Sequence, residues 1–403
     1  MGERHLSAVI LAAGDGTRMK SNRPKVLHPL GGRPMLSWVI DAVRRAGASE
    51  TVVVLRPGAD AIRASLPRGV RTAIQSRPLG TGHAVMAARR SLGAKAGRVL
   101  VLCGDTPLIR SATLRRLASR HRTNHAAVTM LTARLADPFG YGRVLRDDRD
   151  PEQVLGIVEE REATPAQRAI REINSGIYCF DAGALWTNLA RVDNRNRKGE
   201  YYLTDAVGLC ARRGLRTRTV ACDDIEELLG VNTQGELAGA EGILQRRITA
   251  ALLAAGVSIP APERVWIEPD VRIAPDTTVL PGCVLTGRTR VGRGCMIGPG
   301  AHLVDSRLAE DVRVRWSVVE GARIAARVRI GPYAHLRPGT VVERDAYVGN
   351  YTEVNRSRLG EGAKAGHVSY LGDAVIGAGA NIGAGTITAN FDGRRKHPTR
   401  IGG

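Results

Sequence analysis

Aliphatic residues recur every six positions through the second half of the chain, and this period constrains the fold more than any other feature. The repeat first runs unbroken through Ile267, Ile273, Val279, Leu285, Val291, Ile297 and Leu303. After a slip it resumes through Ile324, Ile330, Leu336, Val342, Val348 and Val354, and then, with further slips, through Leu371, Ile376 and Ile382. A fixed period held for this long indicates a solenoid of stacked repeats.

Each six-residue unit has room for one short strand and one turn. Three units close a triangular coil whose aliphatic side chains point inward, while glycine and other small residues turn the corners. Unrelated strands of a β-sandwich would not hold a constant period. The repeat therefore predicts a left-handed parallel β-helix of hexapeptide repeats over residues 259–403.

The first half of the chain follows a different rhythm. Short apolar runs at Ser7–Leu11, Thr51–Leu55 and Val99–Leu102 alternate with helix-like spacing at Met35–Ala46 and Gly82–Ser91. This alternation is typical of an α/β domain built on a parallel sheet. We therefore predict a Rossmann-like fold for the first half.

A helix is expected between the two halves. The apolar residues that share one helical face there are Leu237, Ala240, Leu244, Ile248 and Leu252. Prolines at positions 260 and 262 then mark the start of the solenoid. The chain thus divides into residues 1–228, a helical linker over 229–258, and the β-helix.

Composition narrows the partners and the compartment. The net charge is +20, but its arginines are spread through both halves, aromatic residues make up only 4%, and no nucleic-acid-binding motif is found. We therefore expect no nucleic-acid partner. No apolar run approaches the ~20 residues that span a membrane, and the first apolar stretch is too short for a signal peptide. Six scattered cysteines without a CxxC pair indicate reduced thiols in a cytoplasmic protein that is not inserted in a membrane.

A glycine-rich loop, LAAGDGTRM, follows the first strand. Gly14 and Gly16 allow a tight turn that brings backbone N–H groups close to phosphates, and Arg18 and Lys25 add positive charge. Such a loop alone is a weak signal, because dinucleotide-binding folds use similar turns. Asp105 follows another buried strand, and the ends of parallel strands are where α/β sheets bind their ligands.

Further motifs follow the loop. They are PKVL (24–27), QSRPLGTGHA (75–84), GD (104–105), GYGR (140–143), IVEE (157–160), EINSGIY (172–178), GEYYLTD (199–205) and GVN (230–232). These motifs are followed in the sequence by the predicted β-helix. In this combination the chain resembles the bacterial bifunctional N-acetylglucosamine-1-phosphate uridylyltransferases / glucosamine-1-phosphate N-acetyltransferases over essentially its whole length. The resemblance implies uridylyl transfer from UTP to N-acetylglucosamine 1-phosphate with release of pyrophosphate, and acetyl transfer from acetyl-CoA to glucosamine 1-phosphate. The product would feed the synthesis of peptidoglycan and lipopolysaccharide precursors.

The resemblance also implies residue roles in the first half. The uridine nucleotide would contact Leu11, Ala12, Ala13 and Gly14. Lys25 would reach its phosphates, and Arg18 would stabilise the departing pyrophosphate. Asp105 and Asn232 would ligate Mg²⁺, which prefers oxygen donors. The uracil would be read by Gln75, Gly80 and Thr81, and the sugar would be held by Gly140, Glu159 and Asn174. Cys103 departs from the family, which usually has tyrosine before Gly-Asp.

In the second half the resemblance implies an acetyl-transfer site. His367 would be the general base, a task that suits an imidazole because its pKa lies near neutrality. Arg337 and Lys364 would bind the sugar phosphate, and Tyr370, Asn381 and Asn390 would position the substrate. Acetyl-CoA would lie along Ala384, Asn390 and Phe391. Such β-helices assemble as trimers with sites between neighbours, so a homotrimer is implied.

Three features lead us to expect that acetyl transfer is weak or absent. Asn355 stands where the family tends to have lysine, and Phe391 stands where it has tyrosine. The chain also ends at Gly403, at the opening of a new hexad, whereas the family continues for several more. We therefore expect an incomplete β-helix domain. Uridylyl transfer, which the first half of the chain would carry out, should survive.

Other functions stay open at this point. The chain could be a monofunctional sugar-1-phosphate nucleotidylyltransferase for another nucleotide or sugar, or a non-catalytic assembly protein of the same architecture. A metal-dependent carbonic anhydrase would also use this β-helix. His302, His335 and His367 lack the close spacing that its metal site needs, so we expect no metal there.

Overall fold

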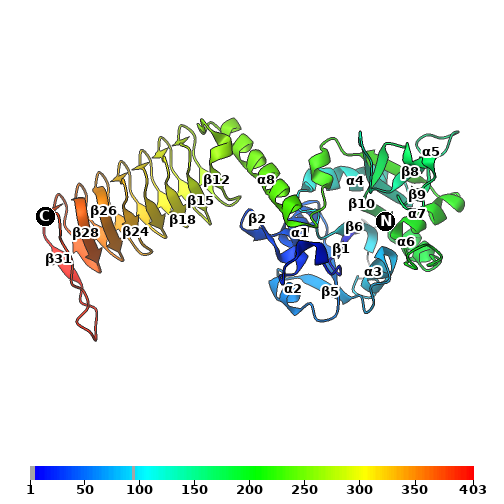
Figure 1. The fold of residues 1–403 in the computed structure, drawn as a ribbon, viewed down its shortest axis with the longest axis horizontal. Helices are drawn as coiled ribbons and strands as arrows, with labels where there is room; N and C mark the ends of the chain where they lie inside the picture. Colours follow the sequence, from blue (N-terminus) through cyan, green and yellow to red (C-terminus); the bar gives the residue numbers. More distant parts are fainter. Residues whose placement is uncertain (1–4, 93–95) are drawn as a thin grey trace. The chain divides into compact units, whose positions relative to one another are not determined.

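A mixed β-sheet forms the centre of the first of two compact units, which divide between Ala240 and Glu241 (Figure 1). The computed structural model describes residues 5–92 and 96–403. The main strand order in the sheet is β11-β7-β10-β6-β1-β4-β5. These strands are β1 (His5–Leu11), β4 (Glu50–Leu55), β5 (Val70–Ile74), β6 (Ala96–Cys103), β7 (Val128–Arg134), β10 (Glu172–Asp181) and β11 (Thr217–Ala221).

The sheet is mixed, whereas a parallel sheet was expected from the sequence. Strand β10 lies between β6 and β7 and runs antiparallel to both. It is preceded by the antiparallel pair β8 (Arg143–Arg146) and β9 (Val154–Val158). A parallel neighbour needs a long crossover that returns the chain to the same edge. The chain reaches β10 through this hairpin instead, so the strand enters in the opposite direction.

Helices cover both faces of the sheet. They are α1 (Met35–Arg45), α2 (Asp60–Ser65), α3 (Thr81–Ala88), α4 (Ser111–Thr123), α5 (Pro165–Arg168), α6 (Ala182–Leu189) and α7 (Leu203–Arg212). Strand β1 shows why its sequence is almost continuously apolar. Ala8 and Ile10 pack into the core on the side of α1 and α4, whereas Val9 packs into the core on the side of α3, α6 and α7.

The second unit is a parallel β-helix with three faces. The first face holds β12 (Trp266–Ile267), β15 (Val284–Thr286), β18 (His302–Val304), β21 (Val318–Glu320) and β24 (His335–Leu336). The second holds β14 (Thr278–Val279), β17 (Met296–Ile297), β20 (Arg313–Val314), β23 (Arg329–Ile330) and β30 (Asn381–Ile382). The third holds β13 (Arg272–Ile273), β16 (Arg290–Val291), β19 (Arg307–Leu308), β22 (Arg323–Ile324), β25 (Val341–Val342), β27 (Arg358–Leu359), β29 (Ala374–Ile376) and β31 (Thr399–Ile401).

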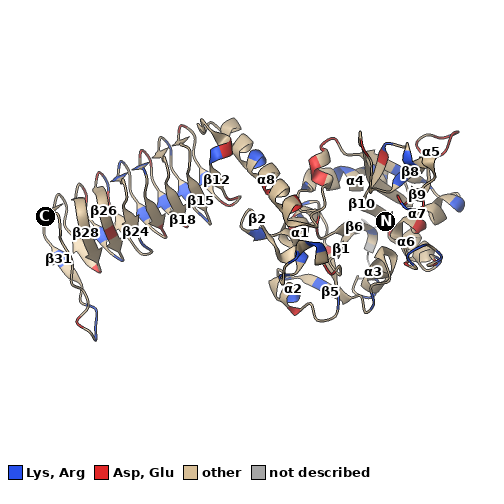
Figure 2. Ribbon diagram, in the orientation of Figure 1, with Lys and Arg blue, Asp and Glu red and all other residues tan. Residues whose placement is uncertain are grey.

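Two strands are longer than the six-residue repeat predicts. Strands β26 (Tyr347–Asn355) and β28 (Lys364–Gly372) each continue from the second face, round the intervening corner, to the first face. They stay hydrogen-bonded to each other along most of that path. Basic side chains occur in both units (Figure 2), as the spread of arginines in the sequence suggests.

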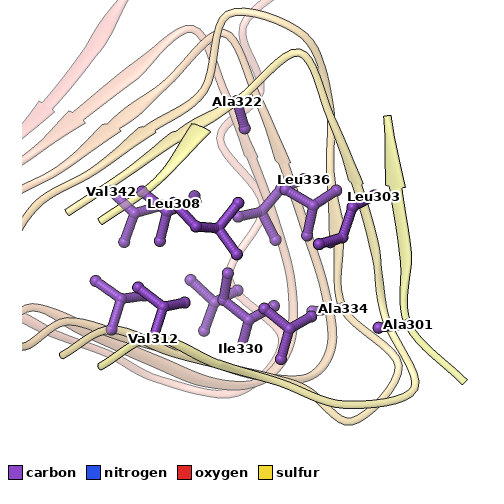
Figure 3. Packing of buried hydrophobic residues seen from close by; sticks show 14 of the residues in the cluster. Ala301, Leu303, Leu308, Val312, Ala322, Ile330, Ala334, Leu336 and Val342 are labelled. Atoms are coloured by element: carbon purple, nitrogen blue, oxygen red, sulfur yellow. The ribbon is translucent and has the colours of Figure 1, made fainter. Parts of the chain in front are cut away.

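The aliphatic residues of the repeat fill the interior of the β-helix. All those named in the sequence repeat are less than 9% exposed, and Figure 3 shows Leu303, Ile330, Leu336 and Val342 pointing into one shared core. Where the six-residue spacing slips, Leu308, Val314 and Val319 take the inward positions, so five-residue steps keep the coils stacked. The predicted fold class, a Rossmann-like nucleotidyltransferase domain followed by a left-handed parallel β-helix, is confirmed.

Helix α8 (Gln234–Ala254) contains the division between the two units. It lies within the span expected for the linker. In the second unit, Ile248 and Leu252 pack against the first coils of the β-helix core. Gln245 Oε1 accepts a hydrogen bond from the backbone N–H of Ile267 at 3.1 Å. The last turns of α8 therefore close the starting end of the solenoid.

Candidate functional site

The glycine-rich loop is pinned between two strands at the carboxyl edge of the sheet. The backbone N–H of Ala12 donates to the carbonyl of Val54 at 2.9 Å, and the N–H of Gly104 donates to the carbonyl of Leu11 at 2.8 Å. Gly16 adopts a φ of 64°, and a Cβ atom there would lie 2.6 Å from the Cβ of Lys25. Only glycine therefore lets the loop come this close to Lys25.

Four of the predicted site residues meet beside this loop. Lys25 Nζ donates to Asp105 Oδ2 at 2.5 Å and to Asn232 Oδ1 at 3.0 Å. Arg18 Nη2 also donates to Asn232 Oδ1 at 3.0 Å. The side chains of Lys25 and Asp105 are only 13% and 20% exposed, so the ion pair is well shielded. Segments more than 200 residues apart thus form one polar cluster.

The oxygen atoms of this cluster fit a divalent cation. The carboxylate of Asp105 and the amide oxygen of Asn232 both accept from the Lys25 ammonium, and Asn232 also accepts from Arg18. Mg²⁺ takes oxygen ligands and is usually held by one or two protein groups plus phosphates and water. Within residues 5–92 and 96–403, no group of three or more His, Cys, Asp and Glu side chains is suited to a metal. A site completed by substrate phosphates agrees with that donor set.

Asn232 is held in place by the start of α8, which the sequence analysis did not single out. Glu236 Oε2 accepts hydrogen bonds from the N–H groups of Asn232 at 2.6 Å and Thr233 at 3.0 Å. Thr233 Oγ1 accepts in return from the N–H of Glu236 at 3.1 Å. The Thr-x-x-Glu spacing of a capping box was the signal that could have revealed it. The N–H of Val231 also donates to the carbonyl of Asp105 at 2.8 Å, which joins this turn to the residue that follows β6.

The residues expected to read the base lie together around the start of α3. Gln75 Nε2 donates to the carbonyl of Gly80 at 3.0 Å. Gly80 has a φ of 103°, and a Cβ there would lie 2.7 Å from the carbonyl oxygen of Tyr201. Thr81 Oγ1 accepts a hydrogen bond from the N–H of Leu203 at 3.0 Å. Thr81 thus anchors the beginning of α7 in this structure, a structural task that the sequence did not indicate.

The residues expected to hold the sugar are grouped around β10. Asn174 Nδ2 donates to Tyr178 Oη at 2.8 Å, and its Oδ1 accepts from the N–H of Gly176 at 3.1 Å. Burial raises the pKa of Glu159, whose Oε1 accepts from Thr204 Oγ1 at 3.2 Å. Gly140 turns the neighbouring loop with a φ of 85°.

Arg143, in the same motif as Gly140, has a structural role that sequence reasoning missed. Its side chain is only 2% exposed and pairs with Glu160 at 2.7 Å. The N–H of Gly140 also donates to Glu160 Oε2, at 3.3 Å. An almost fully buried arginine must keep its partner, because an unpaired buried charge is strongly unfavourable. Glu160 therefore holds both ends of the 140–143 turn, which includes Gly140, one of the residues expected to bind the sugar.

Cys103 stands at the end of β6 among these groups. Burial raises the pKa of its thiol to about 12, with Asp105 adding to the rise and Lys25 opposing it. Burial also raises the pKa of Tyr178, which lies nearby on β10. The thiol is therefore neutral at physiological pH and is a weak hydrogen-bond donor.

The residues expected to transfer the acetyl group lie near the corner between the first and second faces. His367 is exposed on β28, where it pairs in register with Asn350. On the second face, Lys364 and Asn381 lie side by side on successive coils. On the first face, Tyr370 follows Glu353 in register. Arg337 donates to Glu353 Oε1 at 2.9 Å.

The departure Asn355 and its neighbour Arg356 are both hydrogen-bonded within the coil. Asn355 Nδ2 lies 3.5 Å from Tyr370 Oη, and Arg356 binds Asp373 through two hydrogen bonds of 2.7 and 2.8 Å. Asn390 donates to the same Asp373 at 2.5 Å, so its amide is occupied inside the protein.

The other two residues expected to bind acetyl-CoA are accessible. Ala384 is exposed in a turn, and Phe391 is 60% exposed on the hairpin that ends at Lys396. The three histidines considered for a carbonic anhydrase do not share a row. His302 and His335 follow one another two coils apart on the first face, whereas His367 lies on the corner segment.

The first unit carries a glycine-rich loop beside a cluster of Lys25, Asp105 and Asn232, and the second is a hexapeptide β-helix. Together they define the class of two-domain transferases. The family model of the MobA-like NTP transferase domain matches residues 8–168. The bifunctional protein GlmU of Pelobacter propionicus is 47% identical over 99% of this chain and 87% of its own length. The bifunctional protein GlmU of Trichlorobacter lovleyi is 46% identical over 98% of this chain and 86% of its own length. The chain belongs to the bifunctional GlmU family, which confirms the family predicted from the motifs.

Proposed function

We propose that this chain makes UDP-N-acetylglucosamine by uridylyl transfer from UTP to N-acetylglucosamine 1-phosphate and by acetyl transfer from acetyl-CoA to glucosamine 1-phosphate, the second activity being the weaker because Asn355 and Phe391 depart from the family. The observation that carries the proposal is the Arg18–Lys25–Asp105–Asn232 cluster beside the glycine loop, in a chain 47% identical to a bifunctional relative over 99% of its length. The product serves peptidoglycan and lipopolysaccharide synthesis. A single-activity nucleotidylyltransferase or an assembly protein is not favoured, because the relatives are bifunctional.

In the first reaction, two anions must approach each other. The sugar phosphate attacks the α-phosphorus of UTP, and pyrophosphate leaves with additional charge. Lys25 and Arg18 supply cations at the point where this charge gathers, and the backbone N–H groups of the glycine loop donate to the phosphates. Asp105 and Asn232 would hold Mg²⁺, which neutralises phosphate charge when bound. Lys25, already paired with Asp105, would then turn to the phosphates.

In the second reaction, His367 would take a proton from the amine of glucosamine 1-phosphate as that amine attacks the thioester carbonyl of acetyl-CoA, and the C–S bond would then break to release the CoA thiol. Its exposure on β28 leaves the imidazole accessible to a substrate. Lys364 and Arg337 lie on either side of that corner and would bind the phosphate. The sugar would thus be held across the corner with its amine toward His367.

We also propose that three β-helices assemble around this corner. Trp316, Tyr333 and Tyr351 follow one another there on successive coils, each more than 50% exposed. The rings of Tyr333 and Tyr351 stack with centroids 5.4 Å apart. An exposed aromatic row beside His367 suits a partner that covers it and completes the acetyl-transfer site. Sedimentation should give a trimer, and Tyr333→Ser with Tyr351→Ser should yield smaller species.

The proposed location is the cytoplasm. All six cysteines are free, and burial raises the pKa of every one of them, including Cys179 and Cys210. Free, protonated thiols suit a reducing compartment. Among the described residues, none of the helices has the length and apolar character needed to cross a membrane.

A paired assay tests both activities on the same sample. Pyrophosphate release from UTP and N-acetylglucosamine 1-phosphate should fall at least ~100-fold in Asp105→Asn, because that change removes the charged oxygen ligand. Thiol release from acetyl-CoA and glucosamine 1-phosphate should fall in His367→Asn. Each variant is the control for the other. If Asp105→Asn keeps full uridylyl transfer, or if other nucleotides replace UTP equally well, the proposal is wrong.

A further inference from the structure

Arginine side chains form a row on the third face of the β-helix. Arg272, Arg290, Arg307 and Arg323 occupy equivalent positions on β13, β16, β19 and β22, and each is in parallel register with the next. Adjacent strands lie about 4.8 Å apart, so the four side chains follow one another along the axis of the coil. Figure 2 shows basic residues recurring on successive strands of this unit.

The middle of this row carries uncompensated charge. Arg290, Arg307 and Arg323 are exposed, and in the part of the chain that the structure describes none of them has an acidic side chain within ion-pair distance. Further along the face, Arg358 is neutralised by Glu343 at 2.8 Å. Like charges opposite one another on neighbouring strands destabilise a sheet. A bound anion would remove that repulsion.

The row borders an open groove of about 590 Å³. Its lining combines the three central arginines with Ala309, Ala325 and the half-buried Val341, and its one acidic residue, Glu343, is paired with Arg358. Leu308, Ile324 and Val342 point inward and are almost completely buried, whereas Val341 follows Arg323 in register on the outer surface. A ligand in the groove would therefore meet a single line of guanidinium groups beside small side chains, with Val341 and the paired Glu343 at one end.

We propose that this arginine row binds a linear chain of phosphates, of the kind found in inorganic polyphosphate, laid along the axis of the β-helix. Guanidinium groups bind phosphate oxygens in a bidentate manner, and a single file of them matches a narrow chain with charge on every unit. The groove has no aromatic lining on which the bases of single-stranded nucleic acid could stack. It also offers no Trp, Phe or exposed Leu that would enter a bilayer.

The third face would stay accessible in the proposed trimer. Strands β26 and β28 wrap the corner that carries the exposed Tyr333 and Tyr351, and that corner joins the first two faces of the triangular coil. The third face lies on the opposite side of the triangle. Phosphate-chain binding and assembly would therefore use different surfaces, and the binding does not depend on either transferase activity.

The test compares two triple variants of the full chain with the same loss of charge. Arg290→Gln with Arg307→Gln and Arg323→Gln removes the centre of the row. Arg264→Gln with Arg288→Gln and Arg344→Gln, all exposed outside the row, is the matched control. Binding of fluorescently labelled polyphosphate is measured by anisotropy at several salt concentrations. Thermal unfolding is followed in parallel, and the β-helix transition in that scan shows that the second unit of each protein is folded.

We expect polyphosphate to bind the parent and the control, more weakly as salt rises, and to bind the row variant about 10-fold less tightly or worse. Without polyphosphate the row variant should melt at a higher temperature than the parent at low salt, because the repulsion is gone. Equal loss of affinity in both variants would mean general charge attraction and overturn the proposal. The proposal would also be overturned if the parent protein bound single-stranded oligonucleotides, or vesicles containing anionic lipids, more tightly than it binds polyphosphate.

Discussion

At the scale of single residues, the uridylyl-transfer site depends on side chains that hold other side chains. Asn232 faces Lys25 and Arg18 only while its turn keeps its position, and Glu236 fixes that turn through two backbone hydrogen bonds. Glu236 would not touch the substrate. It is a positioning residue, and its loss should change the Mg²⁺ concentration that uridylyl transfer requires.

Glu236→Ala should raise the Mg²⁺ concentration needed for half-maximal uridylyl transfer several-fold, because Asn232 loses its backbone anchor. Glu236→Gln should recover part of that loss, since its amide oxygen still accepts a hydrogen bond. Titration of activity with Mg²⁺ at saturating UTP measures both. A general loss of helix stability would lower the unfolding temperature and leave the Mg²⁺ requirement unchanged, which would contradict the positioning role.

Gly16 offers a second residue-scale prediction. Gly16→Ala places a Cβ 2.6 Å from the Cβ of Lys25, so Lys25 must move and uridylyl transfer should fall at least ~10-fold. Gly47→Ala is the matched control, because Gly47 also has a positive φ but nothing lies within 4 Å of its Cβ position. Both changes cost about 1–2 kcal/mol of backbone strain, but only the first should lower kcat. Equal kinetics for the two variants would argue against the contact.

At the scale of elements, a buried histidine joins α4 to β7. His121 is 3% exposed, and its Nδ1 lies 3.1 Å from Thr129 Oγ1. Burial lowers the pKa of His121 from 6.5 to about 4, with Arg98 adding to the fall and Asp181 opposing it. The folded protein therefore binds a proton at His121 less tightly than the unfolded chain does.

The free energy of unfolding should consequently fall as the pH drops from about 6.5 to about 4, by on the order of 3 kcal/mol from this group. His121→Gln should remove that part of the pH dependence. His125→Asn, at an exposed histidine one residue beyond the helix cap, should keep it. Urea unfolding at several pH values measures the slope, and an identical slope in His121→Gln would show that His121 does not titrate in this way.

The sequence predicted regular elements better than it predicted departures from regularity. Periodicity identified the inward residues of the β-helix because each coil buries aliphatic side chains at equivalent positions. It could not foresee the nine-residue strands β26 and β28, since a coil that is hydrogen-bonded around its corner has the same inward pattern as one that is not. The direction of β10 was also hidden, because a strand buried on both faces reads the same either way.

The candidate site shows the same limit. The motifs named Arg18, Lys25, Asp105 and Asn232, and the structure brings them together. The roles of Glu236 and Thr81 were missed because each depends on a partner defined only by the fold.

At the scale of the whole molecule, each unit carries its own core. The first unit buries its apolar residues on the two faces of the mixed sheet, and the second buries a continuous column inside the β-helix. The division falls inside α8, whose last turns pack on the solenoid. Two separate cores predict that damage to one unit leaves the other folded.

Two matched cavity variants test this independence. Leu336 in β24 and Leu100 in β6 are both fully buried, and replacing either with alanine should cost about 2–5 kcal/mol through lost burial and the cavity left behind. Leu336→Ala should lower only the calorimetric transition of the β-helix and leave the temperature of half-inactivation of uridylyl transfer unchanged. Leu100→Ala should lower that temperature and leave the β-helix transition in place. One shared transition that moves equally in both variants would mean that the two cores unfold as a single cooperative unit.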